Sequence, residues 1–151
     1  IPIIQFAGRQ DPVAPFDGGS PPFKPVFQTT LKPVRETIMT WVQCNECDPT
    51  TVAETRKGQA LEQKWEQCNS NAPVILWTLE DGGHTWPGGR MFPSEVKMGA
   101  GGLNKDIDAS LEIWSFFKRN PLLTAPDEGE NLQRERVGDT KQQKAPGIET
   151  K

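Results

Sequence analysis

The single histidine of this sequence, His84, lies in a stretch that is rich in glycine. Two glycines precede it and two more follow closely, in the run Asp81-Gly82-Gly83-His84-Thr85-Trp86-Pro87-Gly88-Gly89. Glycine adopts backbone conformations closed to other residues, so the imidazole is expected to be presented on a tight loop. Histidine is also the side chain whose unperturbed pKa, about 6.5, lies nearest neutrality, and it therefore serves readily as a general acid or base. A lone histidine is more often structural, so the neighbouring sequence has to decide between the two roles.

An apolar run of strand length leads directly into this loop. Residues 73–79, Pro-Val-Ile-Leu-Trp-Thr-Leu, are almost all apolar, as expected of a strand buried on both faces of a parallel sheet. In open α/β sheets, ligands and chemistry are found at the loops that leave the carboxyl ends of such strands. This position favours a catalytic role for His84.

A carboxylate follows a second predicted strand. Residues 2–7 read as a short buried strand, and the loop 8–15 that leaves it carries Asp11. Aspartate before proline favours a turn, so Asp11 is expected either to form that turn or to orient the imidazole of His84. The residue types leave both roles open.

The three cysteines, Cys44, Cys47 and Cys68, allow three interpretations: a zinc site, a redox pair or a structural disulfide. With His84 they could form a Cys₃His zinc set, but Cys68 and His84 stand alone instead of forming a second close ligand pair. A redox pair at Cys44 and Cys47 would normally begin a helix after a strand, whereas this one ends a predicted helix. A single structural disulfide is favoured over both, with 47–68 the favoured pairing, and it would indicate an oxidising compartment.

The remaining segments predict an α/β fold. Residues 33–45 predict a helix with one apolar stripe, formed by Val34, Ile38, Trp41 and Val42. Residues 50–58 read as a loop or strand edge, residues 60–66 as an edge strand, and residues 90–105 as an irregular segment. A last helix is expected to open at Asp106 or Asp108, either of which can cap it, and to stop at Asn120-Pro121. Its expected apolar face consists of Ile107, Leu111, Ile113, Trp114, Phe116 and Phe117.

Charge and hydropathy limit the kinds of partner that the chain is expected to bind. The net charge of −3 gives no electrostatic case for binding nucleic acid or an anionic membrane. No apolar run approaches the 18–20 or so residues that span a bilayer.

Residues 122–151 are polar, and such a segment buries too little apolar surface to offset its ordering entropy, so a disordered tail is predicted there. The chain also begins without methionine and directly in a strand, which suggests a piece of something longer.

Several of these pieces together resemble a known family. The segments 2–19, 41–47, 82–89 and 106–110, with Cys68, look like the C-terminal half of the extracellular polyhydroxybutyrate depolymerase and feruloyl esterase group of the α/β-hydrolases. The likeness covers residues 1–121, and the His-Thr-Trp-Pro-Gly loop is its most specific part. It implies the last strands of a mostly parallel sheet with flanking helices, in a secreted or periplasmic protein.

The resemblance also implies roles for individual residues. Asp11 would be the acid and His84 the general base of a Ser-Asp-His triad, in the chain order that α/β-hydrolases follow. The family disulfide falls on Cys47 and Cys68, although this chain has Asn45-Glu46-Cys47 where the family has Asn-Gly-Cys. No Gly-x-Ser-x-Gly occurs in the sequence, and Ser20 is not in a nucleophile elbow, so the serine and the oxyanion hole are expected upstream of Ile1.

Two functions from different classes therefore stay open, beside the zinc-stabilised domain considered above. The first is a carboxylic ester hydrolase without metal or cofactor, acting on a polyester, a feruloylated or acetylated polysaccharide, or a small ester. The second is an inactive hydrolase-like binding module in which the aromatic loop around Trp86 holds a sugar or phenolic ligand. Trp86 is the candidate substrate-binding residue in both. A nucleophile elbow upstream would favour the first.

Overall fold

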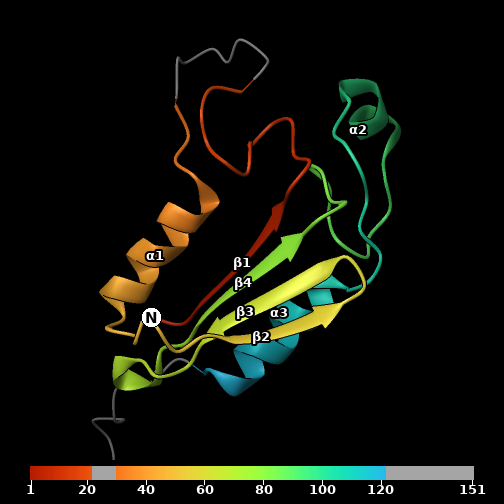
Figure 1. Ribbon diagram of the computed structural model, residues 1–151. Helices are drawn as coiled ribbons and strands as arrows, with labels where there is room; N and C mark the ends of the chain where they lie inside the picture. Colours follow the sequence, from red (N-terminus) through yellow and green to blue (C-terminus); the bar gives the residue numbers. More distant parts are fainter. Residues whose placement is uncertain (22–29, 122–151) are drawn as a thin grey trace, which may run out of the picture. The chain divides into compact units, whose positions relative to one another are not determined.

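A computed structural model describes residues 1–21 and 30–121, and these form an α/β fold around a mixed four-stranded sheet (Figure 1). The strand order is β1-β4-β3-β2. The elements in chain order are β1 (Ile3–Gly8), α1 (Val34–Cys44), β2 (Ala53–Lys57), β3 (Ala60–Trp65), the 3₁₀ turn η1 (Asn69–Asn71), β4 (Val74–Leu79), α2 (Pro93–Met98) and α3 (Ala109–Arg119). No helix within these ranges is long and apolar enough to cross a membrane.

Strand β4 lies inside the sheet, between β1 and β3, as its apolar sequence predicts. All six of its residues are buried. It runs parallel to β1, with Ile3 opposite Val74 and Gly8 opposite Leu79. Because the two strands are parallel and in this register, their carboxyl ends meet at one edge, and the loops that carry Asp11 and His84 leave from there.

The expectation of a mostly parallel sheet is met only by the β1–β4 pair. Strand β3 is antiparallel to both of its neighbours, β4 and β2. The connections explain the difference: two residues join β2 to β3 and residues 66–73 join β3 to β4, whereas a connection between parallel strands needs about a dozen residues or more. The prediction of residues 60–66 as an edge strand is also wrong, since β3 lies between β4 and β2. The edge is β2, whose five residues are all exposed.

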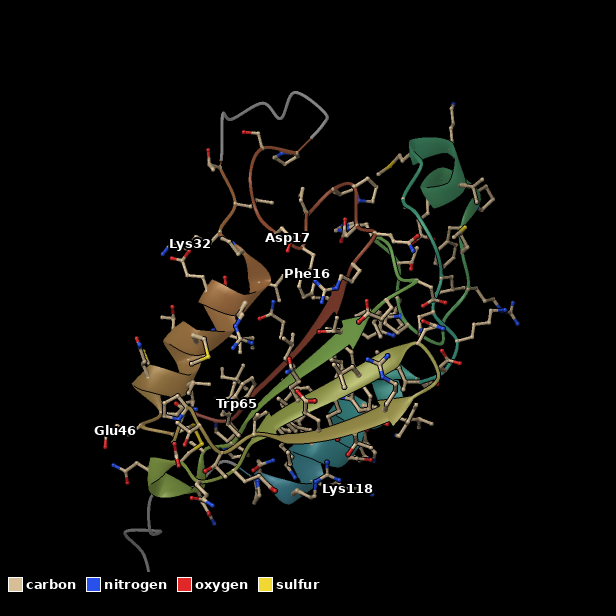
Figure 2. All side chains as sticks on the ribbon, in the orientation of Figure 1. Phe16, Asp17, Lys32, Glu46, Trp65 and Lys118 are labelled. Carbon is tan, nitrogen blue, oxygen red and sulfur yellow. A yellow bond between two sulfur atoms is a disulfide. The ribbon has the colours of Figure 1, made fainter. Side chains whose placement is uncertain are left out.

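Helices cover both faces of the sheet. Helix α1 packs on one face, where Ile38 and Val42 meet Val74 and Leu76 of β4. Trp65 of β3 belongs to the same cluster (Figure 2). Helix α3 packs on the other face, against the alternate β4 residues; this second cluster comprises Ala60, Ile75, Trp77, Leu79, Ile107 and Phe116. Each fully buried aliphatic or aromatic side chain contributes about 1.5–3 kcal/mol, so β4, which supplies both clusters, anchors the fold.

Both predicted long helices form, but the apolar face of the second differs from the expected one. Helix α3 starts after Asp108, whose carboxylate accepts hydrogen bonds from the backbone of Ser110 and Leu111. Its buried residues are Ala109 and Phe116, whereas Leu111, Trp114 and Phe117 are exposed. Apolar residues surround much of this helix, so their spacing alone does not select the buried side. The segment predicted as irregular contains the short helix α2, and the predicted disordered tail, 122–151, lies outside the described residues.

One carboxylate on the α3 face makes stability depend on pH. Glu62 of β3 lies opposite Trp77, and partial burial raises its pKa, with Glu112 adding to the effect. A carboxyl group with a raised pKa stabilises the fold below its unfolded pKa of about 4.3, and that contribution is lost as the pH rises through the folded value. Glu62→Gln is therefore expected to raise the melting temperature at pH 7.

The gain is small, about 0.5 kcal/mol or less, because solvent screens a partly exposed group. Thermal unfolding followed by circular dichroism at pH 7 and pH 3.5 measures it, and the gain should vanish at the lower pH. The matched control is Glu54→Gln on the exposed strand β2, which removes one charge without burial and leaves an amide oxygen that can still accept the hydrogen bond from Gln63. An equal gain from both variants would show that net charge, and not the burial of Glu62, is responsible.

Candidate active site

The loops after β1 and β4 are held together by close backbone approach. The amide of Arg9 donates to the carbonyl of Leu79 at 2.8 Å, and that of Gln10 donates to Gly82 at 2.9 Å. A Cβ atom on Gly8 would overlap the carbonyl of Gly82, so the two loops can lie this close only with glycine at position 8. The loop after β1 and the loop after β4 are thus side by side at the carboxyl edge of the sheet (Figure 1).

Asp11 and His84 contact each other across these loops. The Nδ1 atom of His84 and Oδ2 of Asp11 are 2.9 Å apart. The second carboxylate oxygen, Oδ1, accepts hydrogen bonds from the amides of Val13 at 2.7 Å and Ala14 at 2.8 Å. The predicted contact is confirmed, and the two roles considered for Asp11 are not alternatives: one oxygen forms the turn while the other holds the imidazole.

This contact sets how the ring can act. The side chain of Asp11 is only 10% exposed, while that of His84 is 51% exposed. A carboxylate accepts, so a neutral imidazole bound to it carries its proton on Nδ1 and its lone pair on Nε2. The arrangement provides a base with a fixed tautomer and an accessible lone pair.

A neighbouring segment that the sequence did not single out supports the His84 loop. The amides of Gly83 and His84 donate to the carbonyls of Gly102 and Ala100, and the Thr85 hydroxyl donates to Gly102 at 2.7 Å. Residues 99–104 therefore lie along the His84 loop and support it through these hydrogen bonds. The glycines of this segment are the sequence feature that indicates such a close approach, because a Cβ on Gly101 or Gly102 would collide with the backbone of the opposing segment.

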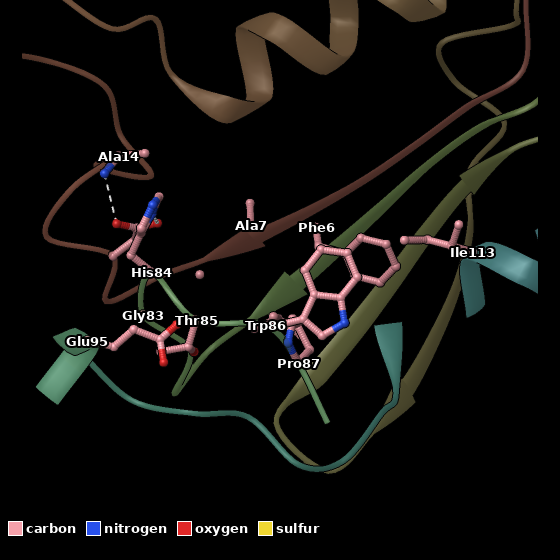
Figure 3. A pocket seen from close by; sticks show the side chains of 13 residues that line it. Phe6, Ala7, Ala14, Gly83, His84, Thr85, Trp86, Pro87, Glu95 and Ile113 are labelled. Carbon is pink, nitrogen blue, oxygen red and sulfur yellow. Dashed lines mark hydrogen bonds and ion pairs between the residues drawn. The ribbon is translucent and has the colours of Figure 1, made fainter. Parts of the chain in front are cut away.

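A cavity of about 550 Å³ opens beside His84. Its walls are mainly apolar; the lining residues are Phe6, Ala7, Gly8, Asp11, Ala14, Leu79, Gly83, His84, Thr85, Trp86, Pro87, Glu95 and Ile113. Figure 3 shows His84 at one end and Trp86 with Ile113 towards the other. The Trp86 ring is half exposed, and its Nε1 donates to the hydroxyl of Ser110 at 3.1 Å, which fixes the ring as a wall of the cavity.

The described lining residues include no serine or cysteine that His84 could activate. Thr85 supplies the one hydroxyl, and that hydroxyl already donates to Gly102. Ser110 lies in α3 and accepts from Trp86. The described site thus combines an imidazole, a carboxylate that contacts it and a mainly apolar cavity.

The predicted disulfide forms between Cys47 and Cys68, and Cys44 is a free, exposed thiol. With two of the three sulfurs joined to each other, the Cys₃His zinc set does not exist. Glu46, which stands where the resembling family has glycine, has a φ of 51°. This left-handed conformation costs a residue other than glycine about 1–2 kcal/mol, so the backbone at this position favours glycine although the residue is glutamate.

Comparison with known proteins gives a partial relationship. A protein from Nocardia uniformis subsp. tsuyamanensis, named "Putative esterase NocK", is 32% identical to this chain over 110 residues. The alignment covers 62% of this chain and 30% of that protein, so the chain spans less than a third of the relative's length. No protein-family model matches the chain, and no solved structure does. The chain is therefore similar, over part of its length, to a protein named as an esterase.

Proposed function

We propose that this chain supplies the acid–base part of a serine-type carboxylic ester hydrolase. Asp11 orients His84 and stabilises its protonated form, and Nε2 of His84 is the general base. The observation that carries the proposal is the contact between Asp11 and His84 at the carboxyl edge of a parallel strand pair, beside an apolar cavity. Similarity to a protein named as an esterase supports the same reaction class.

In the proposed reaction, Nε2 of His84 removes the proton of a serine hydroxyl while the serine oxygen bonds to the ester carbonyl carbon. The tetrahedral intermediate collapses as the imidazolium returns the proton to the departing alcohol, leaving an acyl-serine. Water, deprotonated by the same nitrogen, then attacks the acyl group, and the carboxylic acid leaves as the serine is reprotonated. Asp11 stays ionised throughout and holds the proton on Nδ1.

The serine is proposed to come from a segment outside these 151 residues, on a strand that continues the sheet beyond β1. Within the described ranges β1 has β4 as its single strand partner. The amides of Ile3 and Arg9 point to β4, so the alternate residues, Ile4 and Phe6, direct their backbone groups to the open edge. A parallel strand added there would extend the sheet beyond β1, and its carboxyl end would lie at the same edge of the sheet as the loops of Asp11 and His84.

We also propose a fold for the larger domain to which these residues would belong. Residues 1–121 would be the C-terminal part of an α/β-hydrolase domain of the polyhydroxybutyrate depolymerase or feruloyl esterase group. Trp86 would bind the substrate, which would be a polyester, a feruloylated or acetylated polysaccharide, or a small ester. The disulfide supports a secreted or periplasmic location, because such bonds persist in oxidising compartments.

A test compares two polypeptides: the 151 residues alone, and a polypeptide that also carries the proposed nucleophile segment. Hydrolysis of p-nitrophenyl acetate and butyrate is followed at 405 nm or so, with and without phenylmethylsulfonyl fluoride. The 151 residues are expected to give no more than the rate of free imidazole, and the longer polypeptide an inhibitor-sensitive turnover. Inhibitor-sensitive turnover by the 151 residues themselves would contradict the proposed origin of the nucleophile.

The competing function is a binding module without catalysis. It is favoured by one observation, the absence of a nucleophile among the described cavity residues, with Trp86 exposed at the rim. Quenching of Trp86 fluorescence by ferulate or a xylo-oligosaccharide, together with a longer polypeptide that hydrolyses no ester, would favour the binding module over the hydrolase. Trp86→Phe separates its signal from those of the other tryptophans.

A further inference from the structure

Asn104 lies beneath the His84 loop and is completely buried. Its side-chain nitrogen donates to Oδ1 of Asp81 at 2.7 Å and to Oδ2 of Asp106 at 3.1 Å, and its Oδ1 accepts from the amide of Asp106 at 3.1 Å. Both amide hydrogens and the carbonyl oxygen are therefore used. A fully satisfied buried polar group specifies one arrangement, because every alternative leaves a donor or acceptor unpaired.

The same residue also binds the far end of the loop through its backbone. The carbonyl of Asn104 accepts from the amide of Gly88 at 2.9 Å. Its side chain holds Asp81, where the loop leaves β4, and its main chain holds Gly88, where the loop turns towards α3. His84 lies midway between these two attachments, so Asn104 fixes both ends of the segment that carries the imidazole.

We propose that Asn104 is a positioning residue for His84, acting through the two ends of loop 81–88 and not by touching the imidazole. Its effect on ester hydrolysis rests on the proposed function; its effect on the His84 ring does not.

An amide is the side chain this position requires, because it separates two carboxylates. Asp81 and Asp106 both approach the nitrogen of Asn104, and Asp106 also accepts from the amide of Gln59 at 2.7 Å. Asn104→Asp would present acceptors to acceptors and add a third negative charge. Asn104→Ser keeps a small polar group but offers one donor to two carboxylates. The loop ends should loosen in both variants, more in Asn104→Asp.

The experiment uses the fact that His84 is the only histidine of the chain. Nitrogen-15 NMR of the histidine-labelled chain therefore gives one Nδ1 and one Nε2 signal, without assignment. At a pH high enough for the imidazole to be neutral, the unmodified chain is expected to carry the ring proton on Nδ1. Asn104→Asp and Asn104→Ser are expected to shift both signals towards the mixed tautomers of free histidine, the first more than the second.

A matched control separates positioning from general destabilisation. Val42→Ala creates a cavity in the α1 core, on the other face of the sheet from α3, and is expected to lower the melting temperature while leaving the His84 signals in place. Asn104 variants that fold and keep both signals unshifted would overturn the proposal. An equal shift from Val42→Ala would overturn it as well. If Asn104→Asp does not fold, Asn104→Ser decides by the same criterion.

A second experiment measures kcat and KM for ester hydrolysis by a polypeptide that also carries the proposed nucleophile segment. Asn104→Ser is expected to lower kcat by about 10–100-fold with KM changed less than about 3-fold, because a misplaced base slows the chemical step more than binding. Unchanged kcat would overturn the positioning role. If His84→Ala retains full activity, the proposed function fails instead, and the NMR arm still decides on Asn104.

Discussion

Replacing His84 by alanine is expected to lower kcat for p-nitrophenyl butyrate by about 10⁴-fold or more in a polypeptide that contains the nucleophile segment. Without the imidazole no described group accepts the serine proton, and the Asp11 carboxylate is left with its two turn hydrogen bonds. KM should change little, because the base acts on the serine and not on the bound ester. Initial rates over a range of substrate concentrations separate the two constants.

Asp11→Asn is the informative companion variant. Asparagine keeps the size and can accept through its oxygen from the Val13 and Ala14 amides, but it would present an NH₂ group to Nδ1 of His84 and favour the wrong tautomer. A loss of about 10⁴-fold in kcat is expected, as for the equivalent change in a serine protease triad. A loss below about 10-fold in both variants would mean that this pair does not perform the chemistry.

Removing the disulfide is expected to give the largest loss of stability. Cys47 and Cys68 are 21 residues apart, and closing such a loop lowers the entropy of the unfolded chain by an amount worth about 3 kcal/mol. The bond also joins the end of α1 to the segment between β3 and β4, next to the buried Asn45. Urea unfolding of the Cys47→Ser/Cys68→Ser variant measures the loss directly.

The third cysteine provides the control for that experiment. Cys44 is exposed and unpaired, so Cys44→Ser should leave the unfolding midpoint unchanged within error. Peptide mapping under non-reducing conditions should find the 47–68 link in both the unmodified chain and Cys44→Ser. A midpoint that falls equally in the Cys44→Ser variant would show that the stability does not depend on the 47–68 bond.

The parts of the fold that could be predicted are those with a strong local pattern. The continuous apolar run of β4 and the Ile38–Val42 spacing of α1 identify buried elements because burial leaves a period in the sequence. The order and direction of β3 and β2 could not be predicted in this way. Strand direction depends on which partner a strand meets, and a half-buried sequence such as that of β3 fits an edge or an interior position equally well.

The candidate site was predictable for a different reason. Asp11 and His84 each follow a strand with a clear pattern, and parallel pairing of those strands brings their loops to one edge of the sheet. The residue types left the role of Asp11 open, and the family resemblance implied its pairing with His84. Asn104 could not be found, because its role depends on the tertiary contact between residues 99–104 and the His84 loop. Glu46 shows the converse: the backbone adopts the conformation for which glycine is favoured, although the residue is not glycine.

The most direct test of the central claim, that His84 is the base for a serine supplied from outside these residues, is labelling with a fluorophosphonate probe followed by mass spectrometry. In a polypeptide that carries the nucleophile segment, a single serine outside residues 1–151 should be labelled, and His84→Ala should abolish the labelling. The isolated 151 residues should remain unlabelled. Labelling of Ser20 or Ser110, or labelling of the outside serine at an unchanged rate in His84→Ala, would contradict the account.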